Sequence, residues 1–437
     1  MSRPATRRAR RALRWTTALL AMVGAFASAL VWQLNRLDES PLDEVPDRAV
    51  ATSAQAVARG AYLARAGNCQ GCHSAPGGAA YAGGVGVPTP FGMVYAPNLT
   101  PDASTGLGRW TDAQFFRALH NGRSRDGRLL YPAFPYPNYT RITRSDASDL
   151  LAYLRSLPAV AQPDRAHDLR FPFDRQVTLA VWRALYFRPA RTPNDPTRSA
   201  DWNRGAYLVE GLGHCNACHA RRNALGATRD TLDLAGGLIP VQNWYAPALT
   251  SVDEAAMSDW DTASIAALLR DGISARGAVS GPMSDVVSGS TQHLSAQDLR
   301  AMAVYLHDLP TQPGVASAPA RSPTEDAPVP AAGATIYSDR CAACHGERGE
   351  GISGIYPALA GSRAVTMATP ANLVHIVQEG GFPPATQGNP RPFGMPTFAT
   401  VMSDLEVAQV LSWIRHQWGN RAAAVSELDV RRYGTAR

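Results

Sequence analysis

The sequence predicts a mostly α-helical protein with three tandem domains after an N-terminal hydrophobic helix. The chain has 437 residues, which is about three times the ~150 residues of an average domain. A five-residue pattern of two cysteines followed by a histidine occurs three times, each more than a hundred residues from the next. Each occurrence is followed by a later segment with the periodicity of an amphipathic helix, so each marks one helical domain.

The first element, residues 1–35, is an export or anchoring segment. Six arginines lie within the first fourteen positions, and an uncharged run of 18 residues follows from Trp15 to Trp32. As a helix at ~1.5 Å per residue this run reaches roughly 27 Å, close to the thickness of a hydrocarbon core. It is either a retained membrane anchor or a cleaved signal peptide, for which the small residues at 25–29 offer cleavage sites. Both alternatives place the remaining chain outside the cytoplasm.

Charge and composition exclude several functional classes. Of the 42 basic residues six lie in the N-terminal segment, which leaves 36 to balance the 36 acidic residues. A nucleic-acid surface needs positive charge clustered in the globular part, so we expect no nucleic-acid partner. The chain contains no lysine, and this excludes Schiff-base, P-loop and lysine-base chemistry.

The first two domains are duplicates. The sequence RGAYL occurs at 59–63 and again at 204–208, each time shortly before a cysteine pattern. A helix expected to begin at Trp110 has its counterpart at Trp260, and this offset of about 150 residues indicates an internal repeat.

All three domains are expected to end in the same way. A hydroxyl residue followed three positions later by a carboxylate predicts a capping box and a closing helix at Thr143/Asp146, Ser295/Asp298 and Ser403/Glu406. We therefore expect one helical fold used three times. The boundaries are domains at 55–160, 201–311 and 329–420, a Pro-rich linker at 161–200, a Pro/Ala linker at 312–328 and a tail at 421–437.

The cysteine pattern is typical of covalent heme attachment. It reads Cys69-Gln-Gly-Cys72-His73, Cys215-Asn-Ala-Cys218-His219 and Cys341-Ala-Ala-Cys344-His345. Two cysteines at this spacing form thioethers to the two vinyl groups of a porphyrin, and the adjacent histidine then ligates the iron. A zinc site needs four ligands, usually from two neighbouring half-sites, which these separate patterns do not supply. The sequence thus predicts three covalently bound hemes c, each domain having the fold of a class I cytochrome c.

The sixth iron ligand should lie in a loop ahead of each closing helix. A methionine there raises the reduction potential and closes the site. Met283 and Met395 occupy polar, Gly/Pro-flanked segments at matching distances before the caps Ser295 and Ser403. We expect these two methionines to ligate hemes two and three, although a methionine can also simply fill a core.

Domain one departs from this pattern because Phe134, which cannot ligate iron, stands in the corresponding position. Candidates elsewhere are Met93, which is also compatible with a packed strand residue, His120, which could equally cap a helix, and the less favoured His167. We expect heme one to have a histidine or weak-field site and a lower potential than the other two hemes.

These patterns resemble a known family over roughly residues 55–420. With the stretches at 122–140, 236–250 and 413–420, they are similar to the triheme cytochrome c subunit of bacterial membrane-bound periplasmic dehydrogenases. That family includes partners of quinoprotein alcohol dehydrogenase, of flavin-dependent gluconate, sorbitol and fructose dehydrogenases, and of molybdenum hydroxylases of the isoquinoline oxidoreductase and aldehyde dehydrogenase type. A methionine usually replaces Phe134 in the alcohol and gluconate branches, which favours the molybdenum branch.

The resemblance implies an electron-transfer subunit rather than a substrate-oxidising one. It would accept electrons from a dehydrogenase catalytic subunit and pass them to ubiquinone or a terminal oxidase, on the periplasmic side of the inner membrane. Two alternatives stay open. One is a free-standing, membrane-anchored electron donor, and the other is a peroxidase-like multiheme enzyme that uses heme one with His120 as the distal group.

Overall fold

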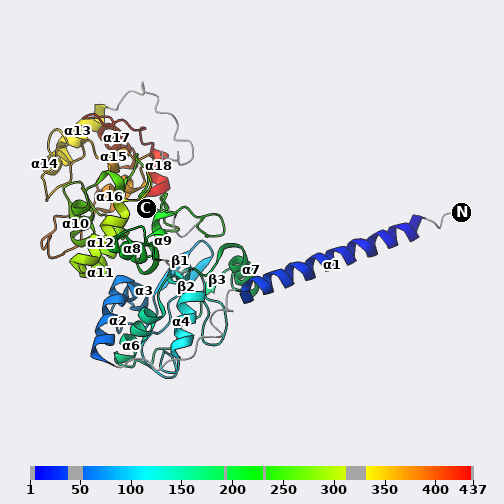
Figure 1. The fold of residues 1–437 in the computed structure, drawn as a ribbon. Coiled ribbons are helices and arrows are strands. Elements are labelled where there is room, and N and C mark those ends of the chain that lie inside the picture. Colours follow the sequence, from blue (N-terminus) through cyan, green and yellow to red (C-terminus); the bar gives the residue numbers. More distant parts are fainter. Residues whose placement is uncertain (1–4, 38–52, 191–193, 230–232, 312–330, 435–437) are drawn as a thin grey trace.

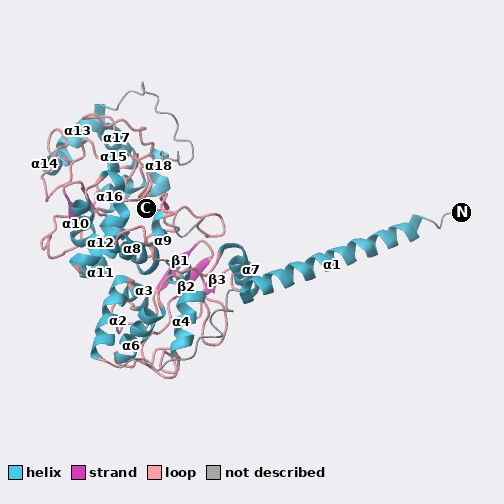
Figure 2. Cartoon of the chain, viewed as in Figure 1, coloured by secondary structure: helices cyan, strands magenta, loops and turns pink. Residues whose placement is uncertain are grey.

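The computed structural model describes residues 5–37, 53–190, 194–229, 233–311 and 331–434. A long helix, α1 (Ala5–Leu37), extends away from a globular body that is made mostly of helices (Figure 1). Strands are short and lie chiefly beside the α7 end of the body (Figure 2). The expectation of a mostly helical protein is confirmed, whereas the linker expected at 312–328 lies outside the described residues.

Helix α1 is joined to the body by buried polar contacts. Its segment Arg11–Arg36 is long and apolar enough to cross a membrane. Near its end, Asn35 donates a hydrogen bond to the carbonyl of Ala180 at 2.9 Å and accepts one from Nε of Arg183 at 3.1 Å. Ala180 and Arg183 belong to α7 (Gln176–Tyr186), and Arg183 is fully buried. The end of α1 is thus docked on the body.

Three helix pairs in the described residues cross in the same way. The pairs are α2 (Ala54–Ala66) with α6 (Arg144–Ser156), α8 (Ala200–Ala206) with α12 (Ala296–His307), and α13 (Ala331–Arg340) with α17 (Asp404–Ile414). We call the segments that contain them unit one (53–160), unit two (200–311) and unit three (331–420).

Each crossing is made at a glycine. A Cβ atom on Gly60 would lie 1.9 Å from the carbonyl oxygen of Asp149, and one on Gly205 would lie 2.1 Å from that of Ala301. In unit three the same construction on Gly333 gives 2.4 Å to the carbonyl oxygen of Gln409. These distances are far shorter than any real contact, so the glycine of each RGAYL repeat is required for the helices to approach.

The remaining elements of unit one surround its cysteine pattern. They are α3 (Cys69–His73), β1 (Gly86–Thr89), β2 (Gly92–Tyr95), α4 (Asp112–Asn121) and α5 (Tyr136–Tyr139). Strand β3 (Asp168–Leu169) pairs antiparallel with β2, which itself pairs with β1. Both β3 and α7 lie within 161–200, so this segment, expected to be a linker, adds a strand and a helix beside unit one.

Units two and three have their own short elements. In unit two these are a π-helix at Tyr207–Leu212, α9 (Asn216–His219), β4 (Gly237–Leu238), β5 (Tyr245–Ala246), a 3-10 turn at Met257–Asp259, α10 (Thr262–Asp271), β6 (Ile273–Ser274), β7 (Gly277–Ala278), α11 (Pro282–Gly289) and a 3-10 turn at Thr291–His293. In unit three they are α14 (Ala342–His345), α15 (Arg363–Thr366) and α16 (Ala371–Glu379), followed by α18 (Glu427–Tyr433) in the expected tail.

The closing helices begin where the sequence predicts, but two of the three capping boxes are wrong. The side chains of Thr143, Ser295 and Ser403 each accept a hydrogen bond from the backbone N–H three residues later. The reciprocal bond is present only in unit three, where the side chain of Glu406 accepts from the backbone N–H of Ser403. In units one and two the corresponding carboxylates are aspartates, which bind arginine and tyrosine side chains instead.

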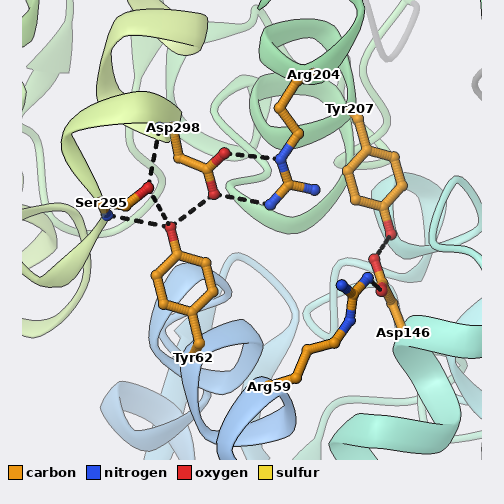
Figure 3. Close-up of polar contacts among 7 residues, drawn as sticks. All are labelled: Arg59, Tyr62, Asp146, Arg204, Tyr207, Ser295 and Asp298. Atoms are coloured by element: carbon orange, nitrogen blue, oxygen red, sulfur yellow. Dashed lines mark hydrogen bonds and ion pairs between the residues drawn. The ribbon is translucent and has the colours of Figure 1, made fainter. Parts of the chain in front are cut away.

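These two aspartates join units one and two (Figure 3). Tyr62 of unit one donates a hydrogen bond at 2.6 Å to Asp298 of unit two. Asp298 also accepts two hydrogen bonds from the guanidinium of Arg204, at 2.8 and 2.7 Å. All three residues belong to the paired helices of units one and two, so the bonds fix how the two pairs meet.

The same contact is made in the opposite direction. Tyr207 of unit two donates a hydrogen bond at 2.5 Å to Asp146 of unit one, which is also paired with Arg59 (Figure 3). Arginine and tyrosine of both RGAYL repeats therefore serve one purpose. We call the six residues of these two sets of bonds the reciprocal contact: Arg59, Tyr62, Asp146, Arg204, Tyr207 and Asp298. One hydrophobic core also spans both units, and unit three has a core of its own.

Unit three is attached to unit two by different residues. The backbone N–H and carbonyl of Tyr245 both bond to the side-chain amide of Asn372, each at 2.8 Å. The ring of Trp244 stacks on His375 with centroids 4.7 Å apart and planes inclined by 13°. Arg363 forms an ion pair with Asp259 at 2.5 Å.

Candidate heme sites

The three cysteine patterns occupy equivalent places in the fold. Each lies in or at the start of a short helix that directly follows the first helix of a unit: α3 after α2, α9 after α8 and its π-helical extension, and α14 after α13. The cysteines are not disulfide-bonded. Burial raises the pKa of Cys69 and of Cys215 to about 12 and that of Cys341 to about 11. These three cysteines are therefore held as neutral thiols rather than thiolates at neutral pH.

Each of the three histidines makes the same kind of hydrogen bond, and this bond fixes its tautomer. Nδ1 of His73 lies 2.8 Å from the carbonyl oxygen of Pro97, and Nδ1 of His219 lies 2.7 Å from that of Pro247. A carbonyl oxygen only accepts, so Nδ1 must carry the proton and the lone pair resides on Nε2. This is the arrangement in which a histidine ligates a metal through Nε2.

Unit three repeats the arrangement with a different loop. Nδ1 of His345 lies 3.0 Å from the carbonyl oxygen of Pro357. Burial lowers the pKa of all three histidines, which keeps each imidazole neutral and able to bind a metal. The sequence analysis missed these prolines as histidine partners. The signal that could have revealed them is the YAP sequence, which recurs at 95–97 and 245–247.

A cavity of about 1200 Å³ adjoins the first cysteine pattern. Cys69, Cys72 and His73 line it together with apolar and aromatic side chains, so the predicted attachment residues face a largely apolar space of the kind a porphyrin needs. Six arginines also line the cavity: Arg128, Arg141, Arg165, Arg188, Arg222 and Arg229. Guanidinium groups match the carboxylates of heme propionates. The residues present therefore fit a covalently attached heme.

The cavity extends beyond unit one in two directions. Two residues of unit two form part of the cavity wall: His214, which directly precedes the second cysteine pattern, and Ala217, which lies within that pattern. On another side it reaches α7, where Val181, Trp182 and Leu185 line it. The first site is thus close both to the second site and to the helix on which α1 is docked.

The position expected for a sixth ligand in unit one is occupied by Phe134. Its ring lines the cavity and lies 5.3 Å from the ring of Tyr139. Met93 and His120 are not among the described residues that line the cavity. Met93 lies in β2 opposite Pro88, and His120 is buried in the last turn of α4.

His167 lines the cavity, but its ring is oriented by a different bond. Its Nδ1 accepts a hydrogen bond from the backbone N–H of Tyr95 at 3.1 Å. In the neutral ring this leaves the proton on Nε2, the opposite of the tautomer found at the three cysteine-linked histidines. Burial lowers the pKa of His167, which favours that neutral form.

The two candidate methionine ligands lie in the expected units in different local structures. Met283 is in the first turn of α11, because Pro282 at the start fixes a helical φ angle. Met395 is in a loop held to Gly381 by two backbone hydrogen bonds of 3.0 and 2.8 Å. Both side chains are half-buried against the core of their unit.

Trp244 connects these two methionine segments. Gly281, two residues before Met283, has φ +53° and lies against the indole, since a Cβ there would be 2.7 Å from the ring. The opposite contact of the indole is the stack on His375 in α16 of unit three. The helix α16 ends next to Gly380 and Gly381, which pack on the Met395 loop. One aromatic contact thus spans from the second site to the third.

A helical fold with cysteine pairs, each followed by a neutral histidine whose Nε2 is available to a metal, defines a c-type cytochrome. The sequence matches the cytochrome c family profile over residues 57–158 and 330–418, in agreement with this class. Such a protein holds its heme by thioether bonds.

The relatives identify the family more closely. The chain is 37% identical over 394 residues to the cytochrome c subunit of alcohol dehydrogenase (quinone) from Komagataeibacter europaeus, covering 86% of this chain and 83% of the relative. It is 38% identical over 398 residues to the gluconate 2-dehydrogenase cytochrome c subunit of Pantoea cypripedii, covering 86% and 88%. It is also 40% identical over 403 residues to a subunit of nicotinate dehydrogenase from Pseudomonas putida, covering 91% of this chain but only 33% of that relative. The chain belongs to the family of cytochrome c subunits of dehydrogenases.

Proposed function

We propose that the chain is the triheme, membrane-anchored electron-transfer subunit of a periplasmic dehydrogenase. It accepts electrons from a catalytic subunit of the quinoprotein, flavoprotein or molybdenum hydroxylase class and delivers them to ubiquinone or a terminal oxidase. The single observation that carries the proposal is the bond from Nδ1 to a proline carbonyl at His73, His219 and His345, which prepares three equivalent metal ligands.

Each unit would hold one heme c. The thioether bonds would form at Cys69 and Cys72, at Cys215 and Cys218, and at Cys341 and Cys344, with Met283 and Met395 as sixth ligands in units two and three. When bound, heme c supplies reversible one-electron chemistry. The chain's own residues hold the histidines in one tautomer, exclude water with apolar walls and offer arginines to the propionates.

Unit one would differ from the other two in its sixth ligand. Phe134 offers no ligand, and the hydrogen bond that Nδ1 of His167 accepts leaves the proton on Nε2, the nitrogen that would have to bind the iron. To ligate the iron, Met93 and His120 would have to leave their places in β2 and α4. We therefore propose a weak-field or open sixth position and a lower potential at this site. Low-temperature EPR tests this proposal, because three ordinary His/Met low-spin signals would contradict it.

The proposed location is the periplasmic face of the inner membrane, with α1 as anchor. The cavity of the first site extends to α7, and α7 is docked on the end of α1. An apolar carrier dissolved in the membrane could approach the first site along this path. This favours ubiquinone over a terminal oxidase as the acceptor.

Purification of the tagged full chain from native membranes in mild detergent tests the proposal. We expect a heme-to-chain ratio of three by pyridine hemochrome absorbance, a stoichiometric catalytic subunit, and reduction of a short-chain ubiquinone when the dehydrogenase substrate is added. A ratio of two contradicts the proposed heme count. Absence of the catalytic subunit favours the free-standing donor, and rapid peroxide turnover by the isolated chain favours the peroxidase-like alternative. Cofactor analysis of the partner identifies its class.

A further inference from the structure

Helix α7 carries an apolar stripe that faces solvent. Val177, Val181 and Leu185 follow one another at intervals of four residues and are 68%, 41% and 61% exposed. Residues four apart lie on the same side of a helix, so the three form one continuous strip. The opposite side of α7 is buried through Leu179 and Arg183. The protein body covers only that buried side of α7, so the exposed strip is an apolar surface of the kind that contacts a membrane or another protein.

The surroundings of the strip are apolar and basic. Phe171, just before α7, is 77% exposed, and Arg175 and Arg188 at the two ends of the helix are also exposed. Asp174 forms an ion pair with Arg175 at 3.3 Å, and no acidic residue follows from 175 to 190, so Arg188 is the arginine of the strip without an acidic neighbour in the sequence. Arginines at the edge of an apolar helix face are typical of a helix that lies in a membrane interface beside anionic headgroups.

Helix α7 is held where α1 leaves the body. Asn35, in the last turn of α1, bonds to the carbonyl of Ala180 and accepts from Arg183, both in α7. Arg183 also donates to the carbonyl of Asn121 in α4, so this junction is tied into unit one. Figure 1 shows α7 at the base of α1, from which α1 extends outward. If α1 spans a bilayer, its C-terminal end lies where the chain leaves the membrane, and α7 is then at the bilayer surface.

The apolar surface continues onto unit two. The indole N–H of Trp182 donates a hydrogen bond at 3.0 Å to the carbonyl of Leu225. The side chain of Leu225 is itself exposed. The strip is therefore part of a broader surface made by α7 and one loop of unit two.

We propose that α7 is a second membrane contact, lying in the plane of the bilayer with Val177, Val181 and Leu185 in the boundary between headgroups and acyl chains. The proposal rests on the proposed function in one respect, that α1 is a membrane anchor. A helix of this kind sits roughly 5–10 Å into the interface. Since Val181 and Leu185 also line the cavity of the first site, the contact would bring that cavity against the lipid.

Photolabelling of the full-length holoprotein in vesicles tests this contact. The vesicles contain phosphatidylethanolamine, phosphatidylglycerol and a phosphatidylcholine with a diazirine on its acyl chain. After irradiation, mass spectrometry locates the adducts. We expect adducts on peptides of α1 and of α7 and none above background on α18, which lies away from α1 (Figure 1) and whose Leu428 is 73% exposed, more than any residue of the strip. Replacement of Val181 and Leu185 by Asn should remove the α7 adducts and leave those on α1, whereas Leu428→Asn should change neither.

Each outcome separates the two proposals. Adducts on α1 alone would overturn the α7 contact and leave the anchor standing, and the strip would then be assigned to a protein partner such as the catalytic subunit or a second copy. Adducts on neither helix would overturn the anchor and the α7 contact together. Equal labelling of α7 and α18 would also refute the contact, because it would mean that the probe reaches exposed apolar residues without a bilayer. Heme absorbance of every variant verifies that it has folded.

Discussion

Replacing Tyr207 by Phe should weaken the reciprocal contact while leaving the fold intact. The substitution removes one hydroxyl, which donates to Asp146 at 2.5 Å and accepts from the backbone N–H of Thr143 at 3.2 Å. The side chain of Asp146 is 3% exposed. Water therefore cannot easily replace the lost donor, and the carboxylate keeps its pairing with Arg59.

A hydrogen bond to a charged group contributes about 1.5–3 kcal/mol, and the loss of the Tyr207 hydroxyl should cost this amount. Units one and two share one hydrophobic core, so they should unfold in one transition. For a domain of 150–250 residues each kcal/mol shifts the midpoint by about 2–4 °C. The expected decrease for Tyr207→Phe is roughly 3–12 °C.

Scanning calorimetry of the holoprotein in detergent measures this decrease. Tyr62→Phe, the equivalent change in the other half, should give a decrease in the same range, and Tyr186→Phe on the exposed surface of α7 serves as the matched control. Arg204 and Asp146, from opposite halves, interact electrostatically. The destabilisation of the variant that carries both Tyr62→Phe and Tyr207→Phe should therefore differ from the sum of the two single effects by at least ~0.5 kcal/mol. Midpoints of Tyr207→Phe and Tyr186→Phe that coincide would refute the role assigned to the contact.

Three further predictions concern the sites and their acid stability. Phe134→Met should supply the missing thioether at the first site, raise its potential and add a methionine-to-iron charge-transfer band; unchanged redox titration curves would count against the assignment. Replacing Cys341 and Cys344 together by Ala should lower the pyridine hemochrome signal by one heme per chain, and an unchanged signal would contradict attachment there. Burial alone would raise the pKa of Asp298, but the guanidinium and phenol bound to it hold the pKa below 3.8. The unfolded state then binds more protons, so stability should be lost as the pH falls below about 3.8, and Asp298→Asn should flatten this loss in acid titrations followed by circular dichroism.

Local patterns in the sequence were sufficient to predict the helix caps. Thr143 and Ser403 are caps because a hydroxyl three residues before a backbone N–H satisfies it without help from distant residues. The cysteine pattern is likewise local, since thioether and histidine geometry is fixed within five residues. The glycine of RGAYL could be recognised as repeated, although its purpose depends on a helix that arrives some ninety residues later.

Contacts between distant segments account for what the sequence did not predict. Asp146 has the spacing of a capping box, but its short side chain is used by Arg59 and Tyr207, one of which lies in another unit. The prolines of 161–200 suggest a linker, whereas α7 within it is stabilised by a bond to Asn35 far back in the chain. Neither partner is visible from local periodicity.

The reciprocal contact also limits how this architecture can grow. In it the same set of side chains, arginine, tyrosine and aspartate, is presented by both members of the pair. An interface of this isologous kind closes on itself, because each patch is consumed by its mate and none is left to recruit another copy. Unit three, which has AGATI at 332–336 where the others have RGAYL, is attached through Asn372 instead. Units one and two thus use up their shared contact residues on each other, and a further RGAYL unit would find no partner in this contact.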